Sequence, residues 1–153
     1  VDQRLEFHLI GSMTRTVQVP RLVDHGRYER DQFATLAAEI RPSATAVMSV
    51  WAETYSHTVT ESWSVGVPVI GSNLGAVAER IRKRGGGWII DPNDAEGAYA
   101  TILRVLTDEG EWERQRAAAT ITGLPSASLT ISPRLTGPSW SAALPMKRKP
   151  PAV

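Results

Sequence analysis

Two glutamates, Glu53 and Glu61, are separated by seven residues and bracket the segment with the clearest potential for chemistry. The segment between them is rich in hydroxyl groups and holds one histidine: Thr54, Tyr55, Ser56, His57, Thr58, Val59 and Thr60. An ionised carboxylate only accepts hydrogen bonds, and its two oxygens can accept from both hydroxyls of a vicinal diol such as a ribose. Such a role suits Glu61, and Glu53 could hold sugar hydroxyls in the same way.

The segment follows a predicted buried strand, residues 44–50, and opens a predicted helix, residues 57–65. The first N–H groups of a helix have no partners within the helix, and the macrodipole adds about half a positive charge there. Together they favour an anion such as a diphosphate. Thr54, Ser56 or Thr58 can cap this helix start or form hydrogen bonds near it. One strand, loop and helix could therefore hold a sugar, a diphosphate and a ribose in order.

A structural explanation of the same residues stays open. Acidic side chains are common at helix starts because they complement the dipole, so the spacing of two glutamates alone indicates little. His57 could donate to a phosphate or a sugar, or it could be an ordinary surface or packing residue. The context favours function, because an apolar strand precedes the pair and the apolar segment 66–71 follows it.

Strands and helices alternate along the rest of the chain, and the connections between them are short. We predict strands at residues 5–10, 44–50, 67–71 and 88–90, with another at 16–19, and helices at 30–41, 57–65, 75–83 and 95–106. This order is typical of an α/β fold with one Rossmann-like, doubly wound parallel sheet. Ligands of such folds bind at the carboxyl ends of the strands.

Composition excludes several classes of function. The 153 residues contain no cysteine, so disulfide scaffolds, thiolate metal sites and cysteine nucleophiles are absent. Three scattered histidines predict no metal site. A net charge of +1 gives no field to attract nucleic acid, and we expect none as a partner. No apolar run approaches the roughly 20 residues of a membrane span, and we expect a cytoplasmic protein.

The two ends of the chain differ from its middle. Residues 120–153 contain six of the ten prolines and keep no helical or strand period, which predicts a disordered tail after a domain at residues 1–119. The chain starts with Val1, without an initiator methionine, almost directly before a strand pattern. We therefore expect it to start at an internal point of a longer protein.

Several motifs taken together resemble one family. Besides the two glutamates, they are the segments Gly66-Val67-Pro68-Val69-Ile70-Gly71-Ser72, Gly75-Ala76-Val77-Ala78-Glu79 and Gly86-Gly87-Trp88-Ile89-Ile90-Asp91-Pro92. Residues 5–106 resemble the carboxyl-terminal Rossmann domain of retaining glycosyltransferases with the two-domain GT-B fold, the large family 4, or group 1. The resemblance implies transfer of a sugar from a nucleoside diphosphate, with retention at the anomeric carbon, and no metal or other cofactor.

The resemblance also implies roles for single residues. Glu61 would bind the ribose hydroxyls, and Glu53 would contact the donor sugar. Backbone N–H groups of Tyr55, Ser56, His57 and Thr58 would face the sugar and the diphosphate, and Thr54 completes the predicted binding segment. We assign catalytic roles to Glu53 and His57. The amino-terminal acceptor domain of the family has no counterpart in this sequence, so a separate or missing domain is an expected partner and unaided transfer is not expected.

The remaining interpretations concern alternative functions of the chain, the segment before the first predicted helix and the basic end of a later helix. A non-catalytic nucleotide-sugar-binding or interaction remnant remains an alternative, whereas a dehydrogenase is disfavoured because no G-x-G-x-x-G follows a strand. Two interpretations of His25 to Tyr28 stay open: the segment lies near the position where the family binds the nucleotide base, or it forms an ordinary turn. The basic end of helix 75–83, with Arg80 and its neighbours, is predicted to be solvated and favoured by the helix dipole.

Overall fold

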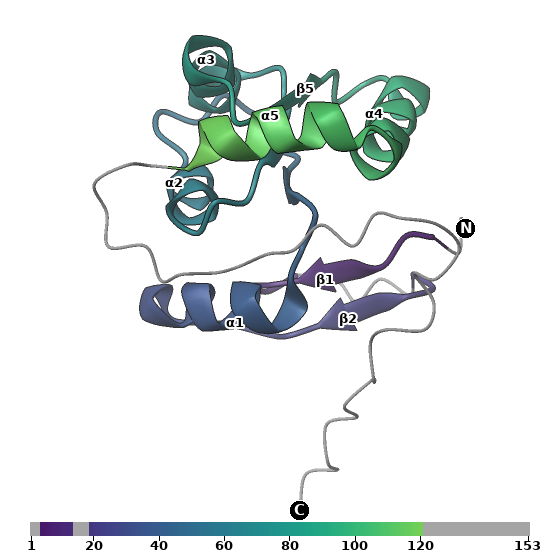
Figure 1. Cartoon of the computed structure of the whole chain (residues 1–153). Coiled ribbons are helices and arrows are strands. Elements are labelled where there is room, and N and C mark those ends of the chain that lie inside the picture. The colour runs from purple at the N-terminus through teal and green to yellow at the C-terminus, as the bar shows by residue number, and fades with distance from the viewer. Residues whose placement is uncertain (1–3, 14–18, 121–153) are drawn as a thin grey trace, which may run out of the picture.

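Parallel strands flanked by helices make up residues 4–13 and 19–120, the part of the chain that the computed structural model describes (Figure 1). β3 (Thr45–Val47), β4 (Val69–Ser72) and β5 (Gly87–Ile90) form a three-stranded parallel sheet in that order. β1 (Phe7–Leu9) and β2 (Leu22–Asp24) pair in parallel as a second group. The predicted α/β class is confirmed. The described strands form two separately hydrogen-bonded sheets, one of two strands and one of three.

Helices follow the strands in the order expected for βαβ units. They are α1 (Phe33–Ile40), preceded by a 3₁₀ turn at Arg30–Gln32, α2 (His57–Ser64), α3 (Gly75–Arg84), α4 (Ala95–Thr107) and α5 (Glu109–Ala119). No helix of the described residues is long and apolar enough to cross a membrane. The predicted tail after Thr120 and most of the predicted strand at residues 16–19 lie outside the described residues.

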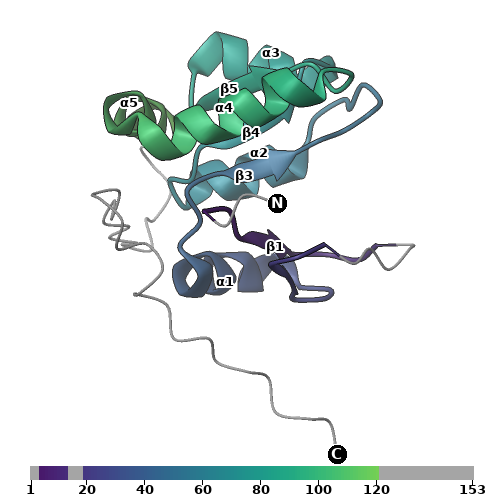
Figure 2. The same ribbon diagram turned by 90° about the vertical axis from the view of Figure 1, so that its right-hand side faces the viewer.

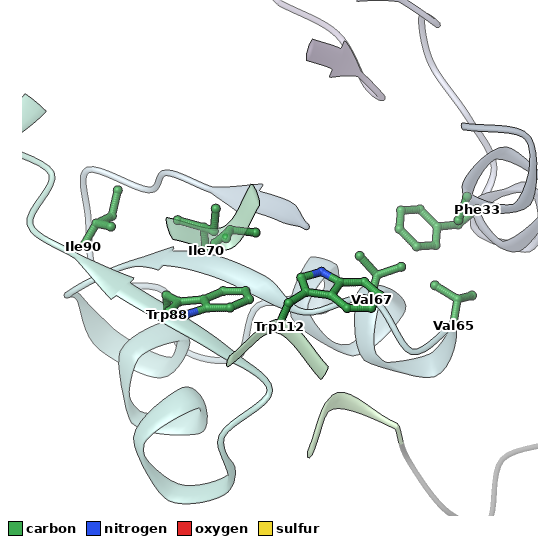
Figure 3. Packing of buried hydrophobic residues seen from close by; sticks show 9 residues of the cluster. Phe33, Val65, Val67, Ile70, Trp88, Ile90 and Trp112 are labelled. Atoms are coloured by element: carbon green, nitrogen blue, oxygen red, sulfur yellow. The ribbon is translucent and has the colours of Figure 1, made fainter. Parts of the chain in front are cut away.

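The β3–β4–β5 sheet is covered on both faces, as a doubly wound fold requires. Helices α2 and α3 pack on one face, where the buried apolar residues are Val47, Val59, Trp63, Val69, Val77 and Ile81. Helices α4 and α5 cover the other face through Ile70, Trp88, Ile90, Val105 and Trp112, and Phe33 of α1 joins this cluster beside Val65 and Val67 (Figures 2 and 3). Sheet residues such as Val69 and Ile70 alternate between these two clusters because successive side chains of a strand point to opposite faces.

Helix α5 is absent from the elements that the sequence predicts. Its residues are mostly charged or small, so the apolar period that marks an amphipathic helix is missing. Asp108 caps the helix by accepting from the N–H of Glu111 at 2.8 Å. Trp112 is its one large buried side chain, and the indole donates to the carbonyl of Ser43 at 2.7 Å. Glu111 and Gln115 also accept hydrogen bonds from Trp88 and Gly87 of β5, so the buried Trp112 and these polar side chains together hold the helix beside β5.

Two helix boundaries follow the predicted local chemistry. Asp94 caps α4 by accepting from the N–H of Gly97 at 2.9 Å, as its place before the helix predicts. Gly66 directly follows the end of α2 with φ of 73°, the left-handed conformation that glycine adopts at low cost. Asp94 therefore starts α4, whereas Gly66 ends α2 and lets the chain turn towards β4.

Candidate functional site

Glu61 is the most completely held of the predicted site residues. Its side chain, on α2, is only 13% exposed. One carboxylate oxygen accepts from the hydroxyl of Tyr28 at 2.8 Å, and the other from Nε of Arg30 at 3.2 Å. Both partners lie in the segment between β2 and α1, more than 30 positions earlier in the sequence. The carboxylate is therefore fixed in orientation by two side chains that the spacing of the glutamates does not reveal.

Tyr28 is a stable hydrogen-bond donor to Glu61. Burial, followed by the hydrogen bond to Glu61, raises the pKa of Tyr28 to about 12. The phenol thus keeps its proton at neutral pH and donates a hydrogen bond to the carboxylate. Its ring packs against Phe33, with the centroids 5.9 Å apart. Each carboxylate oxygen has a second lone pair, so Glu61 can accept further hydrogen bonds from a ligand.

A cavity of about 210 Å³ lies beside Glu61, between α1 and α2. The residues that line it are Arg30, Phe33, Ala34, His57, Thr60, Glu61 and Ser64. The lining therefore contains a carboxylate, a guanidinium cation, an imidazole, two hydroxyl groups and the aromatic ring of Phe33. The structure thus brings two of the predicted residues, His57 and Glu61, to one cavity.

Glu53 lies on the loop before α2 and outside the lining of that cavity. Its carbonyl oxygen accepts from the N–H of Ala76 at 2.9 Å, at the start of α3. Gly75 permits this approach, since a Cβ there would lie 2.6 Å from the same oxygen and its φ is +49°. The Glu53 carboxylate accepts from the hydroxyl of Ser49. Helix α3 therefore fixes the loop, but the described contacts do not join the two glutamates.

Ser56 precedes α2 in a conformation that residues with a side chain rarely adopt. Its φ of 60° and ψ of 92° lie outside the favoured regions. Ser56 is one of the three residues that the sequence offers for capping or hydrogen bonding here, and its side chain makes no capping bond. The residue is 6% exposed, and its hydroxyl has no partner among the described residues. The first amides of α2 are consequently left without this cap.

The remaining predicted residues surround the helix start. Tyr55 and His57 are exposed, with ring centroids 5.0 Å apart, and the hydroxyl of Thr60 donates to that of Tyr55 at 3.4 Å. Thr54 is exposed, whereas Thr58 is half-buried. These residues line the outside of the loop and of the first turn. A ligand can therefore reach this face of the helix start from solvent.

Sequence reasoning missed Arg80, which it assigned to a solvated helix end. The guanidinium donates to the carbonyls of Tyr55 and Ser56 at 3.0 and 2.8 Å, and to the hydroxyl of Thr60 at 3.0 Å. It also stacks on the rings of Tyr55 and Trp63. The prediction that Arg80 is solvated is therefore wrong. The position of Arg80 in its helix does not indicate a contact with Ser56, which is 24 positions earlier in the sequence.

A second unpredicted cluster lies at the β1–β2 pair. Nδ1 of His8 is 2.8 Å from Nε2 of His25, and Nε2 of His8 is 3.0 Å from Glu6. Burial lowers the pKa of His25, and the nearby His8 lowers it further, whereas Asp24 and Glu39 act in the opposite direction. Across residues 4–13 and 19–120, no group of three or more potential ligands is arranged to hold a metal ion.

The family model described as glycosyl transferases group 1 matches residues 28–122, well over half of the chain. The chain belongs to this family. The matched region of the glycosyltransferase domain starts at Tyr28 and contains Glu53, Glu61 and Arg80. The family membership that the motifs predict is confirmed at this level, and glycosyl transfer is the chemistry of the family.

One curated relative of the domain is the Probable sucrose-phosphate synthase 5 of Oryza sativa subsp. japonica. It is 28% identical over 64 residues, which is 42% of this chain and 6% of the relative. The chain therefore corresponds to a small part of that protein.

Proposed function

We propose that this domain binds the nucleoside-diphosphate sugar of a retaining glycosyltransferase and is the carboxyl-terminal half of a family 4, GT-B enzyme. The observation that carries the proposal is the geometry of Glu61. A largely buried carboxylate, oriented by Tyr28 and Arg30, borders a cavity that extends along α2 from His57 at its uncapped start. A diol acceptor and an anion-binding helix start thus lie within one helical turn of each other.

The ribose would bind at Glu61. Tyr28 and Arg30 each use one oxygen of the carboxylate, and the remaining lone pairs can accept from the two ribose hydroxyls. Because the pKa of Tyr28 is raised to about 12, its phenol keeps its proton at neutral pH and serves as a hydrogen-bond donor to Glu61. Arg30 is 68% exposed and lines the cavity, where its charge favours an anionic ligand. This arrangement supports a nucleotide over a neutral sugar alone.

The diphosphate would bind at the start of α2. The residues Tyr55 to Thr58 offer backbone N–H groups, and the helix dipole places positive potential there. No acidic residue lies in the first turn of α2 to oppose a phosphate. His57 borders the cavity from this turn and can donate to the phosphate or the sugar.

Catalysis would then follow from stabilising the leaving group. In a retaining transfer of this kind, the bond between the anomeric carbon and the diphosphate oxygen breaks ahead of bond formation to the acceptor. The amides of α2 would stabilise the negative charge that develops on the diphosphate. Glu53, whose carbonyl is hydrogen-bonded to α3, would hold the donor sugar, and Thr54 would lie beside that sugar. His57 would donate a hydrogen bond to the departing phosphate.

Transfer to an acceptor would need a second domain. We assign the donor-binding role to residues 1–119 and no role to residues 120–153. An amino-terminal acceptor domain, in the same or a separate chain, would close over the cavity and exclude water from the reacting atoms. Such a domain would convert donor binding into sugar transfer.

Calorimetry with the full chain tests donor binding. Uridine, guanosine and adenosine diphosphates are titrated separately into wild type, Glu61→Gln and Glu96→Gln, a control that alters an exposed glutamate on α4. We expect one diphosphate to bind to wild type and to the control, and about tenfold weaker binding or worse to Glu61→Gln, since a hydrogen bond to a charged group is lost. Equal binding by Glu61→Gln, or no binding of any diphosphate to wild type, would contradict the proposal.

A further inference from the structure

Arg80 joins the middle of α3 to the loop that precedes α2. Its guanidinium makes three hydrogen bonds, to the carbonyl oxygens of Tyr55 and Ser56 and to the hydroxyl of Thr60. The same group lies 4.9 Å from the ring centroid of Tyr55 and 5.1 Å from that of Trp63. Arg80 is therefore fixed on several sides at once, by acceptors on the loop and by aromatic rings.

The two carbonyls define the direction of the neighbouring amides. A trans peptide unit is planar, and its C=O and N–H point in opposite directions. The peptide bonds on either side of Ser56 are trans. Because Arg80 holds the carbonyls of Tyr55 and Ser56, the N–H groups of Ser56 and His57 point away from the guanidinium. Both amides are then presented on the opposite side of the loop.

The Ser56 side chain contributes no hydrogen bond to this backbone conformation among the described residues. Ser56 has a positive φ although it carries a side chain, and its buried hydroxyl has no partner among the described residues. A capping side chain would otherwise fix the helix start, and Ser56 supplies none. The contacts from Arg80 are the long-range interactions that hold these two carbonyls.

We propose that Arg80 is a positioning residue that aims the Ser56 and His57 amides at the donor diphosphate. The inference rests on the proposed donor-binding function. Arg80 acts through the backbone, from the side of the loop opposite to the ligand. Nη1 of Arg80 donates to both carbonyls, while Nη2 donates to Thr60 and the guanidinium stacks on two rings. The single ammonium nitrogen of lysine cannot make all of these contacts at once, because it has no second nitrogen and no plane to stack. The role therefore requires arginine and depends on shape as well as on charge.

Binding measurements with matched ligands test the proposal. Wild type, Arg80→Lys, Arg80→Met and Lys83→Met are prepared as full chains. Lys83→Met removes a positive charge from an exposed residue of the same helix. The probes are the uridine, guanosine or adenosine diphosphate that binds wild type most tightly, and the nucleoside of the same base.

We expect both Arg80 variants to bind the diphosphate about tenfold more weakly, a change of about 1.4 kcal/mol, and the nucleoside within about twofold of wild type. Lys83→Met should bind both probes as wild type does. An equal loss for diphosphate and nucleoside would assign Arg80 a purely structural role and overturn the proposal. Unchanged diphosphate binding by Arg80→Lys would overturn it as well.

A ligand-free measurement separates this inference from the proposed function. Amide resonances of wild type and Arg80→Lys are compared by nuclear magnetic resonance, which tests the chain even if Arg80→Met does not fold. We expect the signals of Ser56 and His57 to shift strongly in Arg80→Lys and to stay in place in Lys83→Met. Unshifted signals refute the positioning role, whereas shifted signals in a chain that binds no diphosphate refute the donor function instead.

Discussion

The β3–β4–β5 sheet and the β1–β2 pair differ in how completely helices cover them. Val69 on β4 and Val59 and Val77 on the helices beside it are fully buried. By contrast, Phe7 on β1 and Val23 on β2 are each 37% exposed. Figure 1 shows the same division, with α1 beside β1 and β2 and the helices α2 to α5 gathered around the other strands. The first group is a packed core, and the second is a lightly covered edge.

The candidate site draws different parts from these two groups. The backbone amides and Glu61 come from α2, which packs on the buried sheet, whereas Tyr28 and Arg30 come from the segment that follows β2. The buried group thus fixes the direction of the backbone amides, and side chains from the exposed group fix the orientation of the Glu61 carboxylate. We infer that stability and ligand geometry respond to different residues, which the following variants test.

The largest effect is expected in the buried group. Trp63 is 2% exposed, and its indole donates to the carbonyl of Gly86 at 2.8 Å. Trp63→Ala should lower the free energy of unfolding by about 3–5 kcal/mol, because it leaves a cavity and removes one of two hydrogen bonds to the Gly86 carbonyl, which also accepts from the N–H of Val69. Phe7→Ala in β1 is the matched variant of the exposed group. Denaturant unfolding should give it a clearly smaller loss, and equal losses would contradict the comparison.

An intermediate effect is expected where α3 meets the Glu53 loop. A Cβ at Gly75 would lie 2.6 Å from the carbonyl oxygen of Glu53, and the φ of +49° disfavours a side chain. Gly75→Ala should therefore cost about 1–3 kcal/mol of stability and displace the loop. Gly110→Ala, at a glycine with space around it on α5, is the control and should not destabilise. A Gly75→Ala protein as stable as the control would show that the close approach is unimportant.

A smaller effect is expected for the hydrogen bond between the two groups. Tyr28→Phe removes the 2.8 Å bond to Glu61 and should cost about 1 kcal/mol. The double variant Tyr28→Phe with Glu61→Gln should lose less than the sum of the single losses, since the two residues form one interaction. Unfolding by urea measures this coupling. Strict additivity would mean that Tyr28 does not orient the carboxylate.

The smallest effect concerns the His8–His25 contact at the exposed edge. The pKa of His25 is lowered from its ordinary value of 6.5, chiefly by burial and then by His8. Below that pH the unfolded chain takes up the proton more readily than the folded one, so stability should fall as the pH drops. His25→Gln should flatten this part of the pH profile of unfolding. A profile with the wild-type slope would remove His25 as its cause.

Local features of the site were predictable from the sequence, and long-range contacts were not. The apolar segment 67–71 and the turn residues around it predict β4 and the end of α2, and Asp94 predicts the cap of α4. The partners of Glu61 are separated from it by more than 30 positions, and no local period links them. Arg80 looks like a solvated helix end because the dipole alone explains its position. Helix α5 lacks an apolar stripe, so only packing against the sheet reveals it.

The most direct test of the account is a crystal structure of the full chain with the nucleoside diphosphate that binds most tightly. We predict that both ribose hydroxyls donate to the Glu61 carboxylate and that the diphosphate accepts from the amides of residues 55–58. A nucleotide bound elsewhere, or one that leaves Glu61 and the start of α2 without contacts, would contradict the account.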